Sequence, residues 1–477
     1  MDERGIFENI SPLDHRYYQA NQTLFDRLAD YLSERAAVRY CLSVEIALLR
    51  AHLRAADRLT ARLQRQLDRL WQHVSADAVY AEEEITRHNI RALVNVMQRH
   101  LPPEVAAWVH VGATSVDILD TAQAMRIRDA MQKVVIPQLT DLVLVLISRA
   151  EQEAQTAQVG RTHGRHAVPI SFGYALTEYV ARLGKSAQEL VARSADLRGK
   201  LAGAVGAYNA LAVVSTDPVG FEHSVLRELG LKPSEYATQL VEPEYQLRLL
   251  LEINTAFGII ANLADDLRHL QRSEIDEVRE RFGMDQVGSS TMPQKRNPWN
   301  CEHVKSLWKA FMPRVQTFYM DQISEHQRDL SNSASSRFVM EFITGFAAAV
   351  ARMHQVVRDL DVDRDRMLGI LQTAGDTVLA EPAYICLALG GRADAHEVVR
   401  RATLRSETEK RSITAILRQD PDVWRVIETH LQRVGYHDAA QFFAHPELYR
   451  GRAVERTIEL CNRYRSIAEQ IKEDSGV

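Results

Sequence analysis

Cysteine, glycine and proline are all scarce in this 477-residue sequence, and each scarcity excludes a class of protein. The 4 cysteines, Cys41, Cys301, Cys386 and Cys461, are far apart and form neither a CxxC pair nor another metal-ligand spacing. A disulfide scaffold is therefore excluded, and a reduced, cytoplasmic setting is the simplest expectation. With only 22 glycines and 14 prolines, long helices are favoured over a strand-rich fold with many turns.

The sequence also lacks a strong charge of one sign and a long apolar run. A formal net charge of -5 argues against nucleic-acid binding as the main purpose, although it permits a local basic pocket for a small anion. The charged start, residues 1–4, is followed by no apolar run, so no signal peptide is expected. The longest apolar stretches, 142–147 and 343–350, fall short of the about 18 residues that a membrane span needs. We expect neither a nucleic-acid partner nor a membrane.

Helical periodicity is what the sequence does contain. Apolar residues recur at three- and four-residue steps, and no stretch shows strand alternation of useful length. The pattern predicts an all-α fold, a bundle of long helices that other subunits extend. The expected long helices are 120–156, 173–203, 243–282 and 301–358, the last interrupted near 329–336. The expected helical domains are 1–111, 112–364 and 365–477.

Two polar loops flank the first long helix. Thr114-Ser115 precedes it and Thr162-His163 follows it. A helix of roughly 35 residues is about 50 Å long at about 1.5 Å per residue, so the loops lie at opposite ends of one chain. If both serve one active site, they come from different chains. This spacing predicts an oligomer with shared sites.

The stretch from Gly288 to Pro298, with the sequence GSSTMPQKRNP, interrupts the helical pattern between two long helices. A loop held in this way is a common place for catalytic groups. It offers a hydroxyl at Ser289 and an ammonium at Lys295. On composition alone, a plain helix-to-helix linker is the simpler interpretation.

Further polar residues stand at loops and helix ends, and each has a simple structural explanation when taken singly. His88 can be a surface histidine, and Thr114-Ser115 with Asp117 can be a helix cap. His163 can be a turn residue, and Glu302 can be a first-turn helix acid. Together these groups suit the removal of a carbon-bound proton and the expulsion of an amine, which need a supported base and an oriented acid. This chemistry needs no metal, and no cofactor is expected.

The loop at 288–298 resembles the signature of the fumarase/aspartase superfamily, whose members release fumarate from succinyl compounds. Within it the sequence is most similar to the adenylosuccinate lyases, and the resemblance covers nearly the whole chain. It implies a three-domain long-helix bundle and a homotetramer with a central multi-helix core and shared sites. It also implies release of fumarate from adenylosuccinate and from the succinylcarboxamide imidazole ribonucleotide of purine synthesis. The segments that carry it are 11–17, 86–89, 160–164, 203–209, 270–275, 288–298 and 325–337.

The resemblance assigns a catalytic role to a small group of residues. Ser289 would be the general base, and His163 would be the general acid, oriented by Glu302. Lys295 would bind a succinyl carboxylate, and His88 would assist at the phosphate or at the leaving group. Gly283 and Gly288 would act as hinges of a lid that excludes water.

The remaining implied residues would bind the substrate. Asn297, Thr114 and Ser115 would contact the succinyl carboxylates, and Gln239 would be the substrate-binding glutamine. Arginines give bidentate contacts to phosphate, which fits the next group. The 5′-phosphate would be held by Arg16, Tyr17, Arg328, Ser333 and Arg337. Arg87, Thr162, Ser290 and Met292 complete the implied contacts.

Some positions depart from the adenylosuccinate lyase pattern. Gln294 stands where many of these enzymes have histidine, and glutamine is familiar there in argininosuccinate lyases. The segment 112–121 also resembles carboxymuconate cycloisomerases. Two alternatives therefore stay open: another lyase of a succinylated amine, such as an argininosuccinate lyase or a specialised-pathway relative, and a catalytically silent structural homologue.

Overall fold

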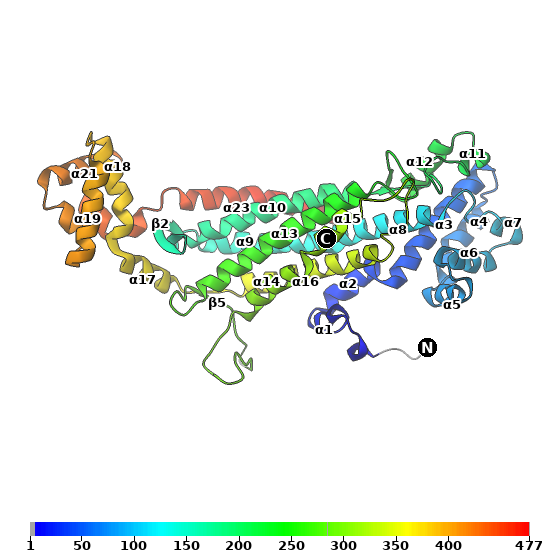
Figure 1. The fold of residues 1–477 in the computed structure, drawn as a ribbon, viewed down its shortest axis with the longest axis horizontal. Coiled ribbons are helices and arrows are strands. Elements are labelled where there is room, and N and C mark those ends of the chain that lie inside the picture. The colour runs from blue at the N-terminus through cyan, green and yellow to red at the C-terminus, as the bar shows by residue number, and fades with distance from the viewer. Residues whose placement is uncertain (1–4, 284, 477) are drawn as a thin grey trace.

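Long helices lie side by side along the longest axis of the molecule, and smaller helical groups cap both ends (Figure 1). The computed structural model describes residues 5–283 and 285–476. The main helices of the bundle are α8 (Ser115–Ala130), α9 (Ile136–Gln152), α10 (Phe172–Ala195), α13 (Pro243–Leu270), α14 (Trp299–Phe311), α15 (Arg314–Met320), α16 (Val339–Arg358) and α23 (Ala453–Ser475). This arrangement confirms the predicted all-α long-helix bundle.

The N-terminal section is a set of shorter helices at one end. Thr60 and Ser75 are the N-cap residues of α4 and α5, where their hydroxyls accept backbone hydrogen bonds. The helices are α1 (Arg16–Ala20), α2 (Gln22–Leu32), α3 (Glu34–Ala55), α4 (Ala61–Asp68), α5 (Ala76–Thr86), α6 (Asn89–Arg99) and α7 (Pro103–Ala106), with η1 (Ile6–Glu8), η2 (Pro12–Asp14) and η3 (Leu70–Gln72). Two more, α11 (Leu211–Val214) and α12 (Pro218–Glu228), lie at the same end (Figure 1).

The C-terminal section forms a separate small helical group. Its core, which includes Leu387, Ile413, Ile427 and Phe442, is a separate cluster from the large core of the bundle. The elements are α17 (Arg364–Ala374), α18 (Ala380–Leu389), α19 (Ala395–Glu409), α20 (Ile413–Leu417), α21 (Pro421–Arg433) and α22 (Ala439–Ala444), with η6 (Gly375–Leu379) and η7 (Pro446–Leu448). The last helix, α23, then returns along the bundle beside α9 and α10. The domain boundaries at 111 and 364 stay a prediction.

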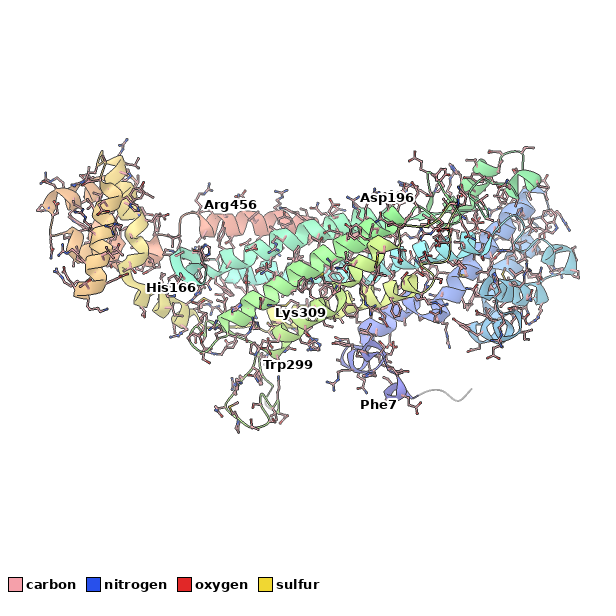
Figure 2. The ribbon with its side chains drawn as sticks, viewed as in Figure 1. Phe7, His166, Asp196, Trp299, Lys309 and Arg456 are labelled. Carbon is pink, nitrogen blue, oxygen red and sulfur yellow. The ribbon has the colours of Figure 1, made fainter. Side chains whose placement is uncertain are left out.

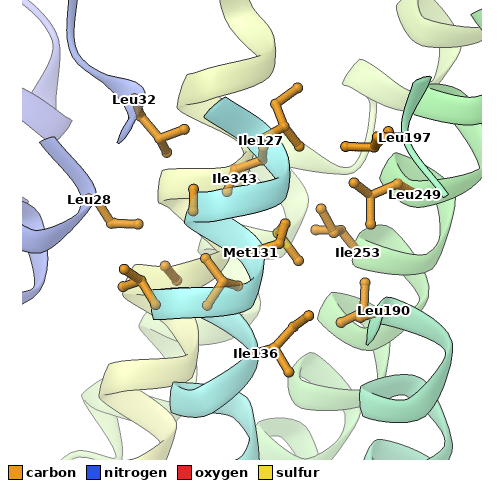
Figure 3. Close-up of a cluster of buried hydrophobic side chains, with 14 of the residues drawn as sticks. Leu28, Leu32, Ile127, Met131, Ile136, Leu190, Leu197, Leu249, Ile253 and Ile343 are labelled. Atoms are coloured by element: carbon orange, nitrogen blue, oxygen red, sulfur yellow. The ribbon is translucent and has the colours of Figure 1, made fainter. Parts of the chain in front are cut away.

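The bundle core is built from the apolar faces that the periodicity predicted. On α13, Leu249, Ile253, Ile260 and Leu263 are all buried. Figure 3 shows this face meeting α10 and the central helix, with Ile253 opposite Met131 and Leu190 opposite Ile136. Burial of such side chains, at about 1.5–3 kcal/mol each, is what holds helices of this length together.

The central helix runs for 38 residues, from Ser115 to Gln152, and its middle contains one π-helical segment. That segment, η4 (Met131–Val135), ends just before Pro137, where the sequence predicts a kink. Proline lacks an N–H and crowds the carbonyl of the preceding turn, and a wider turn accommodates both. The helix is about 57 Å long. Its two flanking loops therefore lie at opposite ends of the bundle, as predicted (Figure 1).

Two helices would pass as membrane spans by length and composition. They are the 38-residue segment Ser115–Gln152 and the 28-residue helix Pro243–Leu270. In the most apolar 18-residue window of each helix, 67% and 61% respectively is buried inside the protein. Both are therefore core helices, whose apolar faces pack against other helices of the chain.

The sequence-based expectation was wrong at two places that matter for the site. The helix expected over 243–282 ends at Leu270, because Asp276 adopts a φ of 54° and the chain then forms β5 (Val278–Arg279) against β6 (Asp361–Val362). Strands were not expected, yet β1 (Ala157–Thr162) and β2 (Arg165–Ser171) form an antiparallel hairpin. Its turn is His163-Gly164, with φ of 54° and 70°, the geometry of a two-residue hairpin turn. A short parallel pair, β3 (Arg198–Gly199) and β4 (Lys232–Pro233), completes the strands of the described residues.

Candidate active site

The loop that carries Ser289 and Lys295 extends away from the bundle, between β5 and α14 (Figure 1). Its base is closed by a few contacts. The Asn297 side-chain amide donates to the Gly288 carbonyl at 3.0 Å. The Arg296 guanidinium lies 5.9 Å from the ring centre of Phe282. A Cβ on Gly288 would meet the Lys295 carbonyl at 2.2 Å, so only glycine permits this approach.

The hydroxyl of Ser289 accepts hydrogen bonds from two backbone N–H groups. Thr291 donates at 3.4 Å and Met292 donates at 3.1 Å. Donors aimed at an oxygen favour its negatively charged form. The loop therefore supplies the backbone N–H support that a serine base requires.

Most of this loop faces open space within a single chain. Ser290, Met292 and Lys295 are exposed, and so is Glu302 in the first turn of α14. Figure 2 shows the side chains of the loop pointing outward beyond Trp299. No hydrogen bond or ion pair of the described residues joins Glu302 to His163. Within residues 5–283 and 285–476, none of these side chains forms a hydrogen bond or ion pair with another predicted acid–base group.

His163 lies at the turn of the β1–β2 hairpin, and both it and Thr162 are exposed. The hairpin is anchored behind them by a buried carboxylate. Arg161 donates to both carboxylate oxygens of Glu277, at 2.6 and 3.1 Å, and Gln158 donates to Glu277 at 2.7 Å. Since Glu277 is fully buried, this clamp fixes the strand that leads to His163.

Arg87 and His88 form the tight turn between α5 and α6. Arg87 adopts a left-handed φ of 54°, and His88 caps α6, its Nδ1 accepting from the Arg91 N–H at 3.3 Å. Both side chains are exposed. The exposure fits the surface-histidine alternative, whereas the capping contact was not expected from the sequence, and it engages Nδ1 and not Nε2.

Thr114 and Ser115 begin α8, at the end of the bundle opposite the hairpin. The Thr114 N–H donates to the Asp117 carboxylate at 2.8 Å, which confirms the helix-cap interpretation for Asp117. The same carboxylate pairs with Lys200, and both side chains are fully buried. The start of α8 is therefore fixed by a buried ion pair rather than by its own turn alone.

Gln239 and Arg328 are brought together by their backbones. The Gln239 N–H donates to the Gln327 carbonyl at 3.0 Å. Arg328 itself has a φ of 108°, and its guanidinium donates to the Asp321 carbonyl at 2.6 Å while its buried Nε has no partner. An unpaired buried donor is costly to the fold.

Tyr17 lies on the other side of the bundle, next to the start of α14. Its hydroxyl is 2.8 Å from the His303 Nε2, one residue after Glu302. Burial lowers the pKa of His303, and the charges of Arg352 and Arg16 lower it further. Burial likewise raises the pKa of Tyr17. Arg16 is exposed beside this pair.

Ser333 and Arg337 lie in the irregular segment before α16, and both are exposed. Arg337 belongs to the short helix η5 (Ser335–Phe338). Its charge lowers the pKa of Tyr80 on α5, which places the guanidinium near the N-terminal helices. Burial is the larger effect on Tyr80, and it raises that pKa.

The predicted residues thus fall into separate groups within one chain. One end of the bundle holds Thr114 and Ser115 at the start of α8, and the Val241 N–H, two residues after Gln239, donates to Asp120 on the same helix. The loop at 288–298 and the hairpin at His163 stand apart from it, as Figure 1 shows for β2 and α8. The contacts of Glu277 and His303 were not expected from the sequence. Nothing in the local pattern marks either residue, because each acts across more than 100 positions of chain.

A groove of about 870 Å³ runs along α10 and α13 beside the hairpin. Its lining includes Arg161, Gly164, Tyr174, Asp266 and His269. Across residues 5–283 and 285–476, no group of three or more His, Cys, Asp or Glu side chains is placed to hold a metal ion.

Comparison with known proteins identifies the family. A lyase family model matches residues 16–310, and a model described as adenylosuccinate lyase C-terminal matches residues 324–438. The adenylosuccinate lyase of Pyrococcus horikoshii is 30% identical over 425 residues, which are 88% of this chain and 92% of that protein. The chain belongs to the adenylosuccinate lyase family. The Archaeoglobus fulgidus adenylosuccinate lyase is 29% identical over 451 residues, covering 94% and 97% of the two chains.

Solved structures show the same fold outside the adenylosuccinate lyase family. A fumarate lyase from Mesorhizobium sp. BNC1 superposes with a TM-score of 0.78 at 21% identity, covering 92% of this chain and 97% of that one. The 3-carboxy-cis,cis-muconate lactonizing enzyme of Pseudomonas putida also superposes with a TM-score of 0.78, at 23% identity. The match covers 94% of this chain and 99% of that one. At these identities the likeness concerns the long-helix bundle that adenylosuccinate lyases share with the wider superfamily.

Proposed function

We propose that this enzyme eliminates fumarate from adenylosuccinate to give AMP, and from the succinylcarboxamide imidazole ribonucleotide to give the carboxamide ribonucleotide. Family membership supports the lyase reaction on a small-molecule substrate. The 4 cysteines are buried and unpaired, which supports a cytoplasmic location.

The reaction follows from the groups that the chain offers. Ser289 takes the proton from the succinyl carbon next to a carboxylate, and that electron pair forms the double bond of fumarate. The carbon–nitrogen bond breaks, and His163 delivers a proton to the leaving nitrogen, with Glu302 holding its tautomer. Lys295 and Asn297 stabilise the carboxylate charge that builds up in between.

One observation carries the proposal: the Ser289 hydroxyl accepts from two backbone N–H groups in a loop that also presents Lys295. A serine hydroxyl is a weak base unless donors and a cation stabilise its ionised form. The same kind of contact caps helices at Ser33 and Ser75, so it is the combination with Lys295 and the family motif that supports the proposal.

We further propose a homotetramer whose active sites are shared between chains. The start of α8 and the turn at His163 are separated by a 38-residue helix. The loop at 288–298 is exposed, and a groove lies along α10 and α13. Packing of a second bundle on this face would cover the groove and bring the separated groups together.

The direct test is a fumarate-release assay with three substrates side by side: adenylosuccinate, its imidazole counterpart and argininosuccinate. We expect turnover of the two nucleotides. Faster turnover of argininosuccinate would favour the sister-lyase alternative. Absence of fumarate from every substrate, checked by mass spectrometry, would favour a catalytically silent homologue.

Two arginine variants test the phosphate site. Arg328→Ala and Arg337→Ala each remove a charged donor, and such contacts are worth about 1.5–3 kcal/mol, or about 10- to 100-fold in affinity. We expect KM for adenylosuccinate to rise by that factor, with a smaller change in kcat. The exposed Arg456→Ala, on α23, is the matched control and leaves KM unchanged. Equal KM values for the wild type and both variants would contradict the assignment of Arg328 and Arg337 to the phosphate site.

A further inference from the structure

Asp120 is a partly buried acid that the proposed reaction does not use. It lies on α8, and its Oδ2 accepts a hydrogen bond from the Val241 N–H at 3.0 Å. Among the hydrogen bonds and ion pairs of residues 5–283 and 285–476, this is the one contact of its carboxylate. The neighbouring Asp117 is instead committed to Lys200.

The contact of Asp120 falls on the short loop that presents Gln239. Ala237 and Val241 form an isolated antiparallel bridge, so Gln239 is at the tip between them. The Thr238 N–H donates to the Leu240 carbonyl at 3.1 Å, which tightens the turn. Asp120 therefore holds Val241, where the chain leaves this loop, against α8.

The same loop is held on its other sides as well. The Gln239 N–H donates to the Gln327 carbonyl at 3.0 Å, next to Arg328. A Cβ on Gly206 would fall 1.8 Å from the Ala237 carbonyl, so the glycine-rich segment presses directly on the loop. Asp120 holds the loop from α8 with a charged side chain, and the Glu242 carboxylate accepts from Ser234 and Tyr236 just before the loop.

The charges around Asp120 come from three elements. Lys200 and Arg328 favour its ionised form, and Asp117 opposes it. Desolvation is the largest effect, and it raises the pKa of Asp120 to about 6. The hydrogen bond from Val241 acts in the opposite direction, as expected for a donor to a carboxylate.

We propose that Asp120 is a positioning residue for the substrate: its carboxylate anchors the 237–241 loop so that Gln239 and Arg328 face one bound molecule together. The inference rests on the proposed function of Gln239 and Arg328 as substrate contacts. Asp120 does not touch the substrate and acts through the backbone of Val241.

The expected signature is a change in KM. Replacement by alanine removes a charge-assisted hydrogen bond, so Asp120→Ala should raise KM for adenylosuccinate about 10-fold and change kcat less than about twofold. Asp120→Asn keeps the size and one acceptor oxygen, so its effect should be smaller. Asp376→Ala is the matched control, because Asp376 is a buried acid that accepts from the backbone N–H groups of Ile413 and Thr414 in the C-terminal group.

A pH series separates positioning from general damage. The substrate phosphate also titrates near pH 6, so the informative quantity is the ratio of KM for Asp120→Asn to KM for the wild type. Above about pH 6 the wild-type carboxylate is ionised and the ratio is largest. The ratio should fall toward one as the pH drops through about 6, because the wild type then loses its charge too.

A double variant completes the test. If Asp120 acts through Gln239, the pair Asp120→Ala/Gln239→Ala should bind no worse than Gln239→Ala alone. Additive losses, a kcat effect without a KM effect, or a KM ratio that is flat with pH would overturn the proposal. If the alanine variant does not fold, the asparagine variant decides by the same criteria. If the wild-type enzyme cleaves argininosuccinate instead of adenylosuccinate, the proposed function is wrong. The Asp120 variants would then be measured with argininosuccinate as the substrate.

Discussion

The loop at 288–298 and the hairpin at 157–171 carry the two halves of the proposed acid–base pair, and they are built in opposite ways. The loop is exposed, and the Asn297 amide and the close approach of Gly288 to Lys295 hold its base. The Arg296 guanidinium also lies over the Phe282 ring. The hairpin is anchored by Glu277, which is fully buried and bound by Arg161 and Gln158. If Ser289 is the base and His163 is the acid, we expect the base to move to its substrate and the acid to be already in place.

The loop can be tested first by removing its base. Ser289→Ala should lower kcat by about 10³-fold, because a positioned general base contributes about 10²- to 10⁴-fold. The melting temperature should stay unchanged, since the loop contributes nothing to the buried core. Fumarate release and thermal unfolding measure the two quantities. Activity within tenfold of the wild type would contradict the role of Ser289.

The hairpin is tested by weakening its anchor. Glu277→Gln leaves the guanidinium of Arg161 without its anionic partner, and breaking a buried pair costs about 3–5 kcal/mol. Since Arg161 is partly exposed, we expect about 2–3 kcal/mol of lost stability and a fall in kcat of about 10-fold or more from displacement of His163. Glu302→Gln is a useful contrast, because its exposed side chain should affect kcat and not stability.

The two glycines of the loop give the finest comparison. Gly288→Ala would place a Cβ 2.2 Å from the Lys295 carbonyl, whereas Gly283→Ala meets nothing closer than 3.8 Å. We expect kcat to fall about 10-fold for the first, because opening the base of the loop misplaces Ser289, and to change little for the second. Equal effects would mean that both glycines serve as hinges, as the sequence-based interpretation has it.

Much of the architecture was predictable because the long helices repeat their apolar residues with a helical period. The inward face of α13 and the great length of the central helix follow directly from that pattern. The hairpin was missed because its strands are short and their hydrophobic pattern is weak. The end of α13 at Leu270 was missed because charged residues continue a helical pattern past a backbone turn at Asp276.

The membership of the candidate site stays a prediction, and the contacts that hold its residues in place could not be predicted from the sequence. Its residues were found through family motifs, which mark positions and say nothing of the anchors behind them. Glu277, His303 and Asp120 act through partners distant in sequence, so no local pattern reveals them. Asp120 had the best available signal, since it lies three residues after Asp117 and so on the same side of α8.

The most direct test of the account is to mix two inactive variants. Ser289→Ala and His163→Ala are each purified, mixed under conditions where exchange of subunits is demonstrated, and assayed for fumarate release from adenylosuccinate. If base and acid reach one site from different chains, hybrid tetramers contain some intact sites and activity returns. Exchange without any recovery would contradict shared sites, and with them the central claim.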